Sequence, residues 1–125
     1  MQENGGSAAD DSYYRQRIAQ LYIEAEAMRL AAYRGLTKTM RSGIPGPEGS
    51  LGKWQWADIN QAISELALDI EGARGQLARG AEHAVANGAW QYSFLRSRAN
   101  SIEGGTTDIL KNIIAERVLG LPRLR

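Results

Sequence analysis

The chain reads Ile102-Glu103-Gly104-Gly105-Thr106-Thr107-Asp108-Ile109-Leu110 where its last helix is expected to begin. Thr106 or Thr107 can cap the first amides of that helix, and Asp108 in the first turn complements the helix dipole. Apolar residues then recur at steps of three and four, as an amphipathic helix requires, at Ile109, Leu110, Ile113, Ile114 and Val118. Gly120 and Pro122 follow as stop signals, so this segment predicts a well-bounded helix.

A long helix is predicted to begin at Ser12, with Asp11 or Ser12 as its cap. Its apolar positions are spaced by three and four residues, at Tyr14, Ile18, Leu21, Ala25, Met28, Ala32 and Leu36. The run Ser42-Gly43-Ile44-Pro45-Gly46-Pro47 must end it, because proline lacks an amide donor and restricts the preceding residue.

A second helix is predicted to start between Ser50 and Trp54 and to end near Gly72 or Gly75. One side carries Trp56, Ile59, Ile63, Leu66 and Ile70, and the other carries Gln55, Asp58, Gln61 and Glu65. Residues 76–88 are rich in alanine and glycine and fit either a short helix or an ordered loop. Residues 89–99 hold much of the aromatic content and fit a short helix packed on the others.

These patterns predict an all-α fold, an antiparallel helical bundle of three main helices and a short one. Residues 1–11 carry no large aliphatic side chain after Met1 and are expected to form a flexible leader. The three tryptophans and the stripe around Met28 are interpreted as core, since they lie at or beside helical spacing.

The composition excludes several classes of function. Fifteen basic residues balance 14 acidic ones, so no overall charge attracts nucleic acid. No cysteine is present and His83 is the single histidine, which argues against a zinc site and against a serine-hydrolase triad. No apolar run approaches the ~20 residues of a membrane span. A soluble, cytoplasmic protein is expected, and a helix-turn-helix regulator is not, because no short helix pair has a concentrated basic face.

The glycine turn is the candidate site for chemistry. Gly104 and Gly105 allow the backbone to approach a ligand closely, and free amides at a helix start suit an anion or an electron-rich carbonyl. The alternative is that the glycines merely make a tight turn. Glu103 beside Ile102 is a candidate base if desolvation raises its pKa, and otherwise it is a solvated loop carboxylate.

The last thirty residues are basic, with Arg96, Arg98, Lys111, Arg117, Arg123 and Arg125. These basic side chains could form a solvated or docking face, or they could contact a phosphate group. The sequence leaves both interpretations open.

The tail from Ser101 to Arg123 resembles the closing signature of acyl-CoA dehydrogenases, particularly the bacterial branch. Residues 15–34 are similar to the second helix of that family's C-terminal domain. The segment 68–75 matches its glycine-rich turn, and Phe94-Leu95-Arg96-Ser97-Arg98 falls where the family has an Arg-Asp-Ala-like segment. The resemblance covers residues 12–125 and implies the family's C-terminal four-helix domain, lacking its first helix.

The resemblance implies a flavoprotein that uses FAD to oxidise an acyl-CoA thioester to its 2,3-enoyl product. It also implies an electron-transfer flavoprotein as electron acceptor and a homo- or hetero-oligomer formed through the helical domain. The family's other two domains are absent, so we expect the chain to be catalytically silent alone. The acyl group, whether fatty acyl or a bulkier sterol side chain, is left open.

The resemblance also implies roles for individual residues, assigned by their position in the matching segments. Gly105, Thr106 and Asp108 match flavin contacts, whereas Asp69, Gly72 and Ala73 match the turn that approaches the adenine-dinucleotide part of a neighbouring subunit's cofactor. Gly104 stands where many members place their catalytic base, and Glu103, the candidate base, lies one residue earlier. The resemblance implies that some members with glycine there take the base from the domain's first helix, and that others have lost catalysis and serve as a partner subunit. The alternative function is a non-catalytic helical oligomerisation module or partner subunit of the same family.

Overall fold

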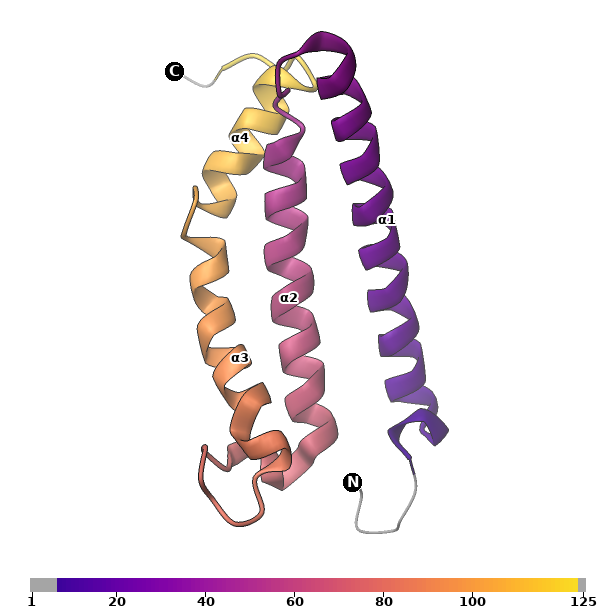
Figure 1. Cartoon of the computed structure of the whole chain (residues 1–125), viewed down its shortest axis with the longest axis vertical. Helices are drawn as coiled ribbons and strands as arrows, with labels where there is room; N and C mark the ends of the chain where they lie inside the picture. Colours follow the sequence, from indigo (N-terminus) through magenta and orange to yellow (C-terminus); the bar gives the residue numbers. More distant parts are fainter. Residues whose placement is uncertain (1–6, 124–125) are drawn as a thin grey trace.

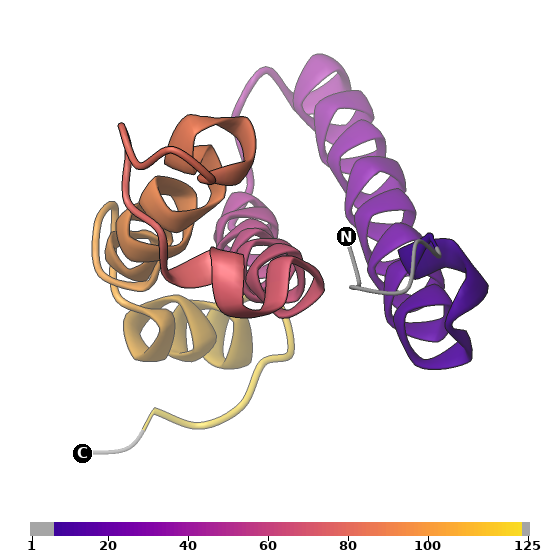
Figure 2. The same ribbon diagram turned by 90° about the horizontal axis from the view of Figure 1, so that it is seen from below.

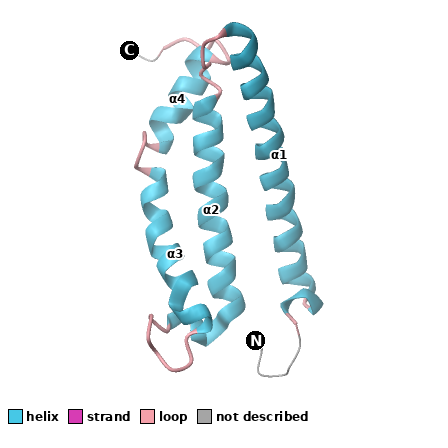
Figure 3. Ribbon diagram, viewed as in Figure 1, coloured by secondary structure: helices cyan, strands magenta, loops and turns pink. Residues whose placement is uncertain are grey.

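A computed structural model describes residues 7–123, and all regular elements within that range are helical (Figure 1, Figure 3). The four α-helices are α1 (Ser12–Ser42), α2 (Gly49–Glu71), α3 (Ala89–Ser97) and α4 (Thr107–Arg117). Short 3-10 helices are η1 (Ala8–Asp10), η2 (Gly72–Gln76), η3 (Val85–Gly88) and η4 (Arg98–Ser101). The predicted all-α class is confirmed. None of the described helices is both long and apolar enough to span a membrane.

The helix ends follow the local signals in the sequence. Asp11 caps α1 by accepting a hydrogen bond from the Tyr13 amide at 2.8 Å, and Gly43 ends it in the left-handed region with φ of 72°. Gly72, with φ of 58° and ψ of −130°, ends α2 in a conformation that glycine tolerates and other residues avoid. Residues 76–88 form an ordered loop with the 3-10 helix η3 rather than an α-helix.

The N-terminal leader falls only partly within the described structure. Residues 1–6 lie outside the described residues, so their predicted flexibility stays a prediction. From Ser7 onward the chain is ordered into η1, where the Ser7 hydroxyl accepts from Ala9 and the Asp10 carboxylate accepts from the Ser7 amide.

The helices are arranged around α2 (Figure 1, Figure 2). α1 runs antiparallel to α2 on one side, while α3 and α4 follow each other along its other side and together make one interrupted rod. The view from below groups α2, α3 and α4 and sets α1 apart (Figure 2). The break in the rod between α3 and α4 is η4 and the glycine turn.

The apolar core is small and centred on α2. Its buried hydrophobic residues are Ala57, Ile59, Leu66 and Leu110. Ser64 and Ser97 are also buried, and each hydroxyl donates to a carbonyl of its own helix, so no polar atom is left unpaired there.

The expectation that the stripe around Met28 and the three tryptophans form the core holds only in part, since Met28 and Trp54 are half-buried. α1 buries none of its residues, Trp56 is 43% exposed and Trp90 is 38% exposed. Ile109 on α4 and Val118, which follows the end of α4, are likewise exposed. The physical reason is that α1 packs chiefly against one neighbour, so the rest of its apolar surface has nothing to cover it.

Candidate functional site

The glycine turn at the start of α4 has a backbone that depends on its two glycines. Gly104 has φ of 65° and Gly105 has φ of 104°, both in the region that favours glycine. Thr106 is then the N-cap of α4, and its hydroxyl accepts from the Ile109 amide at 3.4 Å. The sequence therefore places the turn and its cap correctly.

The amides of this turn face no acceptor within the described chain. None of the hydrogen bonds among residues 7–123 uses the N–H of Gly104, Gly105 or Thr106. Gly104, Thr106 and Asp108 are exposed and Gly105 is partly exposed, so the entrance to α4 is open to solvent and not sealed by the domain's own packing. Such amides at the positive end of a helix are suited to an electron-rich oxygen.

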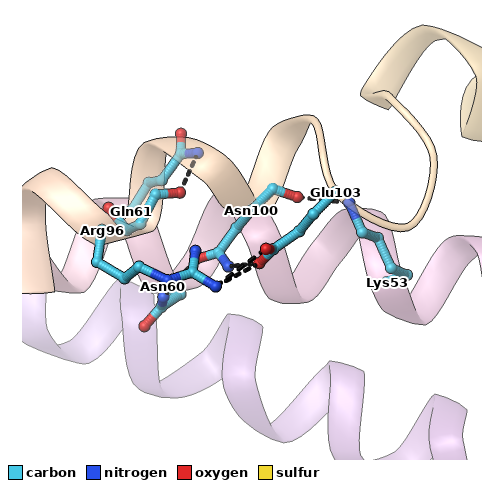
Figure 4. A network of polar contacts seen from close by, with 7 residues as sticks. Lys53, Asn60, Gln61, Arg96, Asn100 and Glu103 are labelled. Atoms are coloured by element: carbon cyan, nitrogen blue, oxygen red, sulfur yellow. Dashed lines mark hydrogen bonds and ion pairs between the residues drawn. The ribbon is translucent and has the colours of Figure 1, made fainter.

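A network of polar contacts ties the turn to α2 (Figure 4). Asn100 is 4% exposed, and its side-chain oxygen accepts from Asn60 at 2.8 Å while its amide donates to Glu103 at 2.7 Å. Gln61 donates to the Ser97 carbonyl at 2.9 Å and to the Ser101 hydroxyl at 2.6 Å. α2 therefore fixes the position of η4 through side chains that bond its backbone and its polar groups.

Glu103 lies in this network and not in a desolvated pocket. Its carboxylate accepts from Arg96 at 2.9 Å, in an ion pair whose side chains are 49% and 45% exposed. The Arg96 guanidinium, and next the Asn100 amide, hold the pKa of Glu103 below its ordinary value. Of the two alternatives that the sequence leaves open, the desolvated base with a raised pKa is not found, because charge-assisted hydrogen bonds outweigh desolvation and lower the pKa of Glu103.

We predict that Glu103→Gln destabilises the chain at neutral pH and not in strong acid. A carboxylate whose pKa is lowered on folding stabilises the fold above its unfolded pKa, near ~4.3, and that contribution is lost as pH falls through the folded value. Urea unfolding at pH 7 and at pH 3 measures this. Glu82→Gln is the control, because Glu82 is exposed and makes no ion pair among the described residues. Equal effects of the two variants at pH 7 would refute the prediction.

The second set of expected cofactor contacts, Asp69, Gly72 and Ala73, lies at the other end of α2. All three are exposed, and the Asp69 carbonyl accepts from the Tyr14 hydroxyl at 3.1 Å, which joins the start of α1 to this turn. Lys53, which contacts the glycine turn, is 16 residues from Asp69, or about 24 Å along the helix axis. The structure therefore does not bring the two sets together within one chain.

An apolar groove lies between α1 and α2, and α3 contributes Trp90 to its lining. It has a volume of about 410 Å³ and no charged side chain in its lining, which consists of Ile18, Leu21, Tyr22, Ala25, Ile63, Leu66, Ala67, Ile70 and Trp90. An exposed groove with an apolar lining is a candidate interaction site.

Sequence reasoning missed the polar face of α2 that holds the turn. Gln61 was assigned to the solvent side, yet it contacts η4. Lys53 and Asn60 are seven residues apart and Gln61 follows, a spacing that puts all three on one face. This spacing of polar residues along α2 could have indicated a second contact face.

The basic residues near the C-terminus are largely engaged within the chain. Arg98 pairs with Glu65 at 3.0 Å and Arg123 with Glu116 at 3.1 Å, and Lys111 lies 5.0 Å from the centre of the Trp54 ring. Arg125 lies outside the described residues. These contacts favour a structural role over phosphate binding. Among residues 7–123, no group of three or more acidic, histidine or cysteine side chains could hold a metal ion.

Comparison with known proteins places this fold in a family. Residues 1–119 match the family model described as acyl-CoA dehydrogenase, C-terminal domain. The chain is 40% identical over 116 residues to acyl-CoA dehydrogenase IpdE1 of Mycolicibacterium smegmatis, a match that covers 93% of this chain and 27% of that protein.

Two solved structures share the fold. The ChsE4-ChsE5 complex from Mycobacterium tuberculosis superposes with a TM-score of 0.83 at 20% identity, over 98% of this chain and 31% of that one. The Tcur3481-Tcur3483 steroid ACAD does so with a TM-score of 0.82 at 23% identity, over 94% and 30%. The chain thus spans less than a third of the length of these relatives. On the evidence of the family model and of the IpdE1 match, it belongs to the acyl-CoA dehydrogenase family and corresponds to that family's C-terminal helical domain.

Proposed function

We propose that this chain is the C-terminal domain of a flavin-dependent acyl-CoA dehydrogenase, which converts an acyl-CoA thioester to its 2,3-enoyl product. The observation that carries the proposal is the open entrance to α4, where the amides of Gly104, Gly105 and Thr106 lack acceptors within the described chain. A buried or internally bonded turn would have had no capacity to bind.

The residues present fit an FAD group at this entrance. Gly105 and Thr106 would offer backbone amides to electron-rich oxygens, and the exposed Asp108 would accept from an N–H or hydroxyl group of the cofactor. Bound there, FAD supplies the oxidising power for hydride removal. Asp69, Gly72 and Ala73 would serve a cofactor held in another subunit, because they lie about 24 Å away along α2.

The α-proton is proposed to be removed by a base from outside this chain. Glu103 is held ionised by Arg96 and Asn100, and its lowered pKa makes it a weak proton acceptor. Gly104, in the position where many family members carry the base, has no side chain to contribute. Glu103 is therefore assigned to holding the turn, and its candidacy as a base rests only on its position.

The wider assembly follows from the short span of the chain relative to its relatives. We expect the groove between α1 and α2 to receive an apolar helix from the remainder of the enzyme, and an oligomer to form through this domain. Electrons are proposed to pass to an electron-transfer flavoprotein. The acyl group is proposed to be either fatty acyl or steroid-like, the latter because one solved relative is described as a steroid ACAD.

Flavin retention tests the proposal. The complete protein that contains this chain is expected to purify with the visible absorbance of bound FAD and to oxidise an acyl-CoA. Gly105→Ala should reduce that absorbance, because it strains the turn and its Cβ lies 3.4 Å from Leu110. Gly120→Ala is the control, since Gly120 also has positive φ but nothing within 4 Å.

A non-catalytic oligomerisation module is the second candidate, favoured by the large apolar groove. A complete protein that assembles normally yet retains no flavin would support this candidate and overturn the first.

A further inference from the structure

Lys53 on α2 is a partly buried lysine whose ammonium group bonds backbone carbonyls. Its Nζ donates to the Asn100 carbonyl (Figure 4). It also donates to the Gly105 carbonyl, at 3.1 Å. It takes part in none of the ion pairs among the described residues. Because a lysine ammonium only donates hydrogen bonds, it holds the carbonyls that it contacts pointing toward it.

The Gly105 carbonyl and the Thr106 amide belong to one planar peptide group. The described chain contains no cis peptide bond, so the N–H of Thr106 points opposite to the Gly105 carbonyl. Because that carbonyl points toward Lys53 on α2, the Thr106 N–H points away from α2 toward the open side of the turn.

The local backbone restrains this orientation only in part. Rotation of the peptide changes ψ of Gly105, which glycine tolerates, and φ of Thr106, now −66°, which a threonine restricts. A full rotation would present a carbonyl where the amide now lies. The hydrogen bond from Lys53 to the Gly105 carbonyl adds a second restraint that keeps the amide outward.

We propose that Lys53 is a positioning residue that fixes the Gly105–Thr106 peptide with its amide directed outward, toward a carbonyl or other electron-rich oxygen of a ligand. That the ligand is the flavin or its thioester partner rests on the proposed function. The orientation of the peptide is independent of the proposed function.

The test compares Lys53→Met, which removes the donor, with Lys53→Arg, which retains it. In an amide-resolved NMR spectrum of the chain, the Gly105 and Thr106 signals should move, broaden or double in Lys53→Met and return toward the wild-type positions in Lys53→Arg. Lys111→Met is the control, because Lys111 is a lysine of α4 that stacks on Trp54 instead of bonding the turn.

Unchanged Thr106 signals in a folded Lys53→Met chain overturn the proposal. If that variant does not fold, Lys53→Leu takes its place, since it also lacks a donor; a Thr106 signal identical to wild type then overturns the proposal equally.

Flavin binding by the complete protein gives a separate readout. Lys53→Met should weaken FAD affinity about three- to tenfold, the loss expected for one oriented hydrogen bond, and Lys53→Arg should restore it. Absence of FAD from the wild-type protein would refute the proposed function alone, because the NMR comparison needs no ligand.

Discussion

Replacement of Leu110 by alanine should lower the free energy of unfolding by about 2–4 kcal/mol, one of the two largest effects expected in this chain. Leu110 is 5% exposed and is the one residue that α4 buries among those described. It also lies under the glycine turn, where a Cβ on Gly105 would be 3.4 Å from Leu110 Cδ2. Its removal therefore leaves a cavity that rigid neighbours cannot fill. Urea denaturation of the chain measures the loss.

Ile109→Ala is the matched control for this prediction. Ile109 is the preceding residue of the same helix and has similar size, but it is 53% exposed. Its truncation should cost less than about 1 kcal/mol. Similar losses for the two variants would show that Leu110 does not anchor α4 to α2.

Gly88→Ala should destabilise the chain by about 2–5 kcal/mol. Gly88 has φ of 74°, where a side chain costs about 1–2 kcal/mol. In addition, an added Cβ would lie 2.7 Å from the Arg79 backbone nitrogen, and overpacking of this kind costs about 1–3 kcal/mol. Backbone atoms cannot rotate away as a flexible side chain can. Thermal unfolding followed by circular dichroism measures the change.

Gly80→Ala separates the two causes. Gly80 has φ of 88° in the same loop, yet an added Cβ would have nothing within 4 Å. Only the backbone strain should appear, so Gly80→Ala is expected to cost about 1–2 kcal/mol. If Gly88→Ala lowered the free energy of unfolding no more than Gly80→Ala does, the close contact with the Arg79 backbone would not contribute to the destabilisation.

Helix boundaries could be predicted because they depend on nearby residues. α1 spans Ser12–Ser42 as the Asp11 cap and the proline-glycine run after it indicated. Thr106 caps α4 as predicted, and Gly72 ends α2. Caps, glycine conformations and proline restrictions act within a few residues, so sequence alone determines them.

Burial could not be predicted in the same way. Trp56 and Ile63 lie on the predicted apolar side of α2, but they are 43% and 37% exposed, while Ile59 and Leu66 on the same side are buried. Periodicity identifies a face that needs a partner and does not say whether this chain supplies one. Ile63, for example, lines the groove between α1 and α2.

The backbone of the candidate site could be predicted, whereas the sequence left open whether Glu103 is a desolvated base or a solvated carboxylate. The turn at Gly104 and Gly105 is where the sequence placed it. The lowered pKa of Glu103 depends on Arg96, seven residues earlier, and on Asn100, whose position is set by Asn60 of α2. Such contacts are made by tertiary packing, and a linear pattern does not contain them.

The one-sided packing of α1 makes its stability separable from that of the other helices. α1 packs chiefly against α2, and none of its residues is buried. It should therefore open without unfolding the remaining helices, and its amide hydrogens should exchange with solvent before those of the other helices. While α1 is open, its apolar stripe is accessible to proteases, so cleavage of the chain should begin there before the remaining helices unfold.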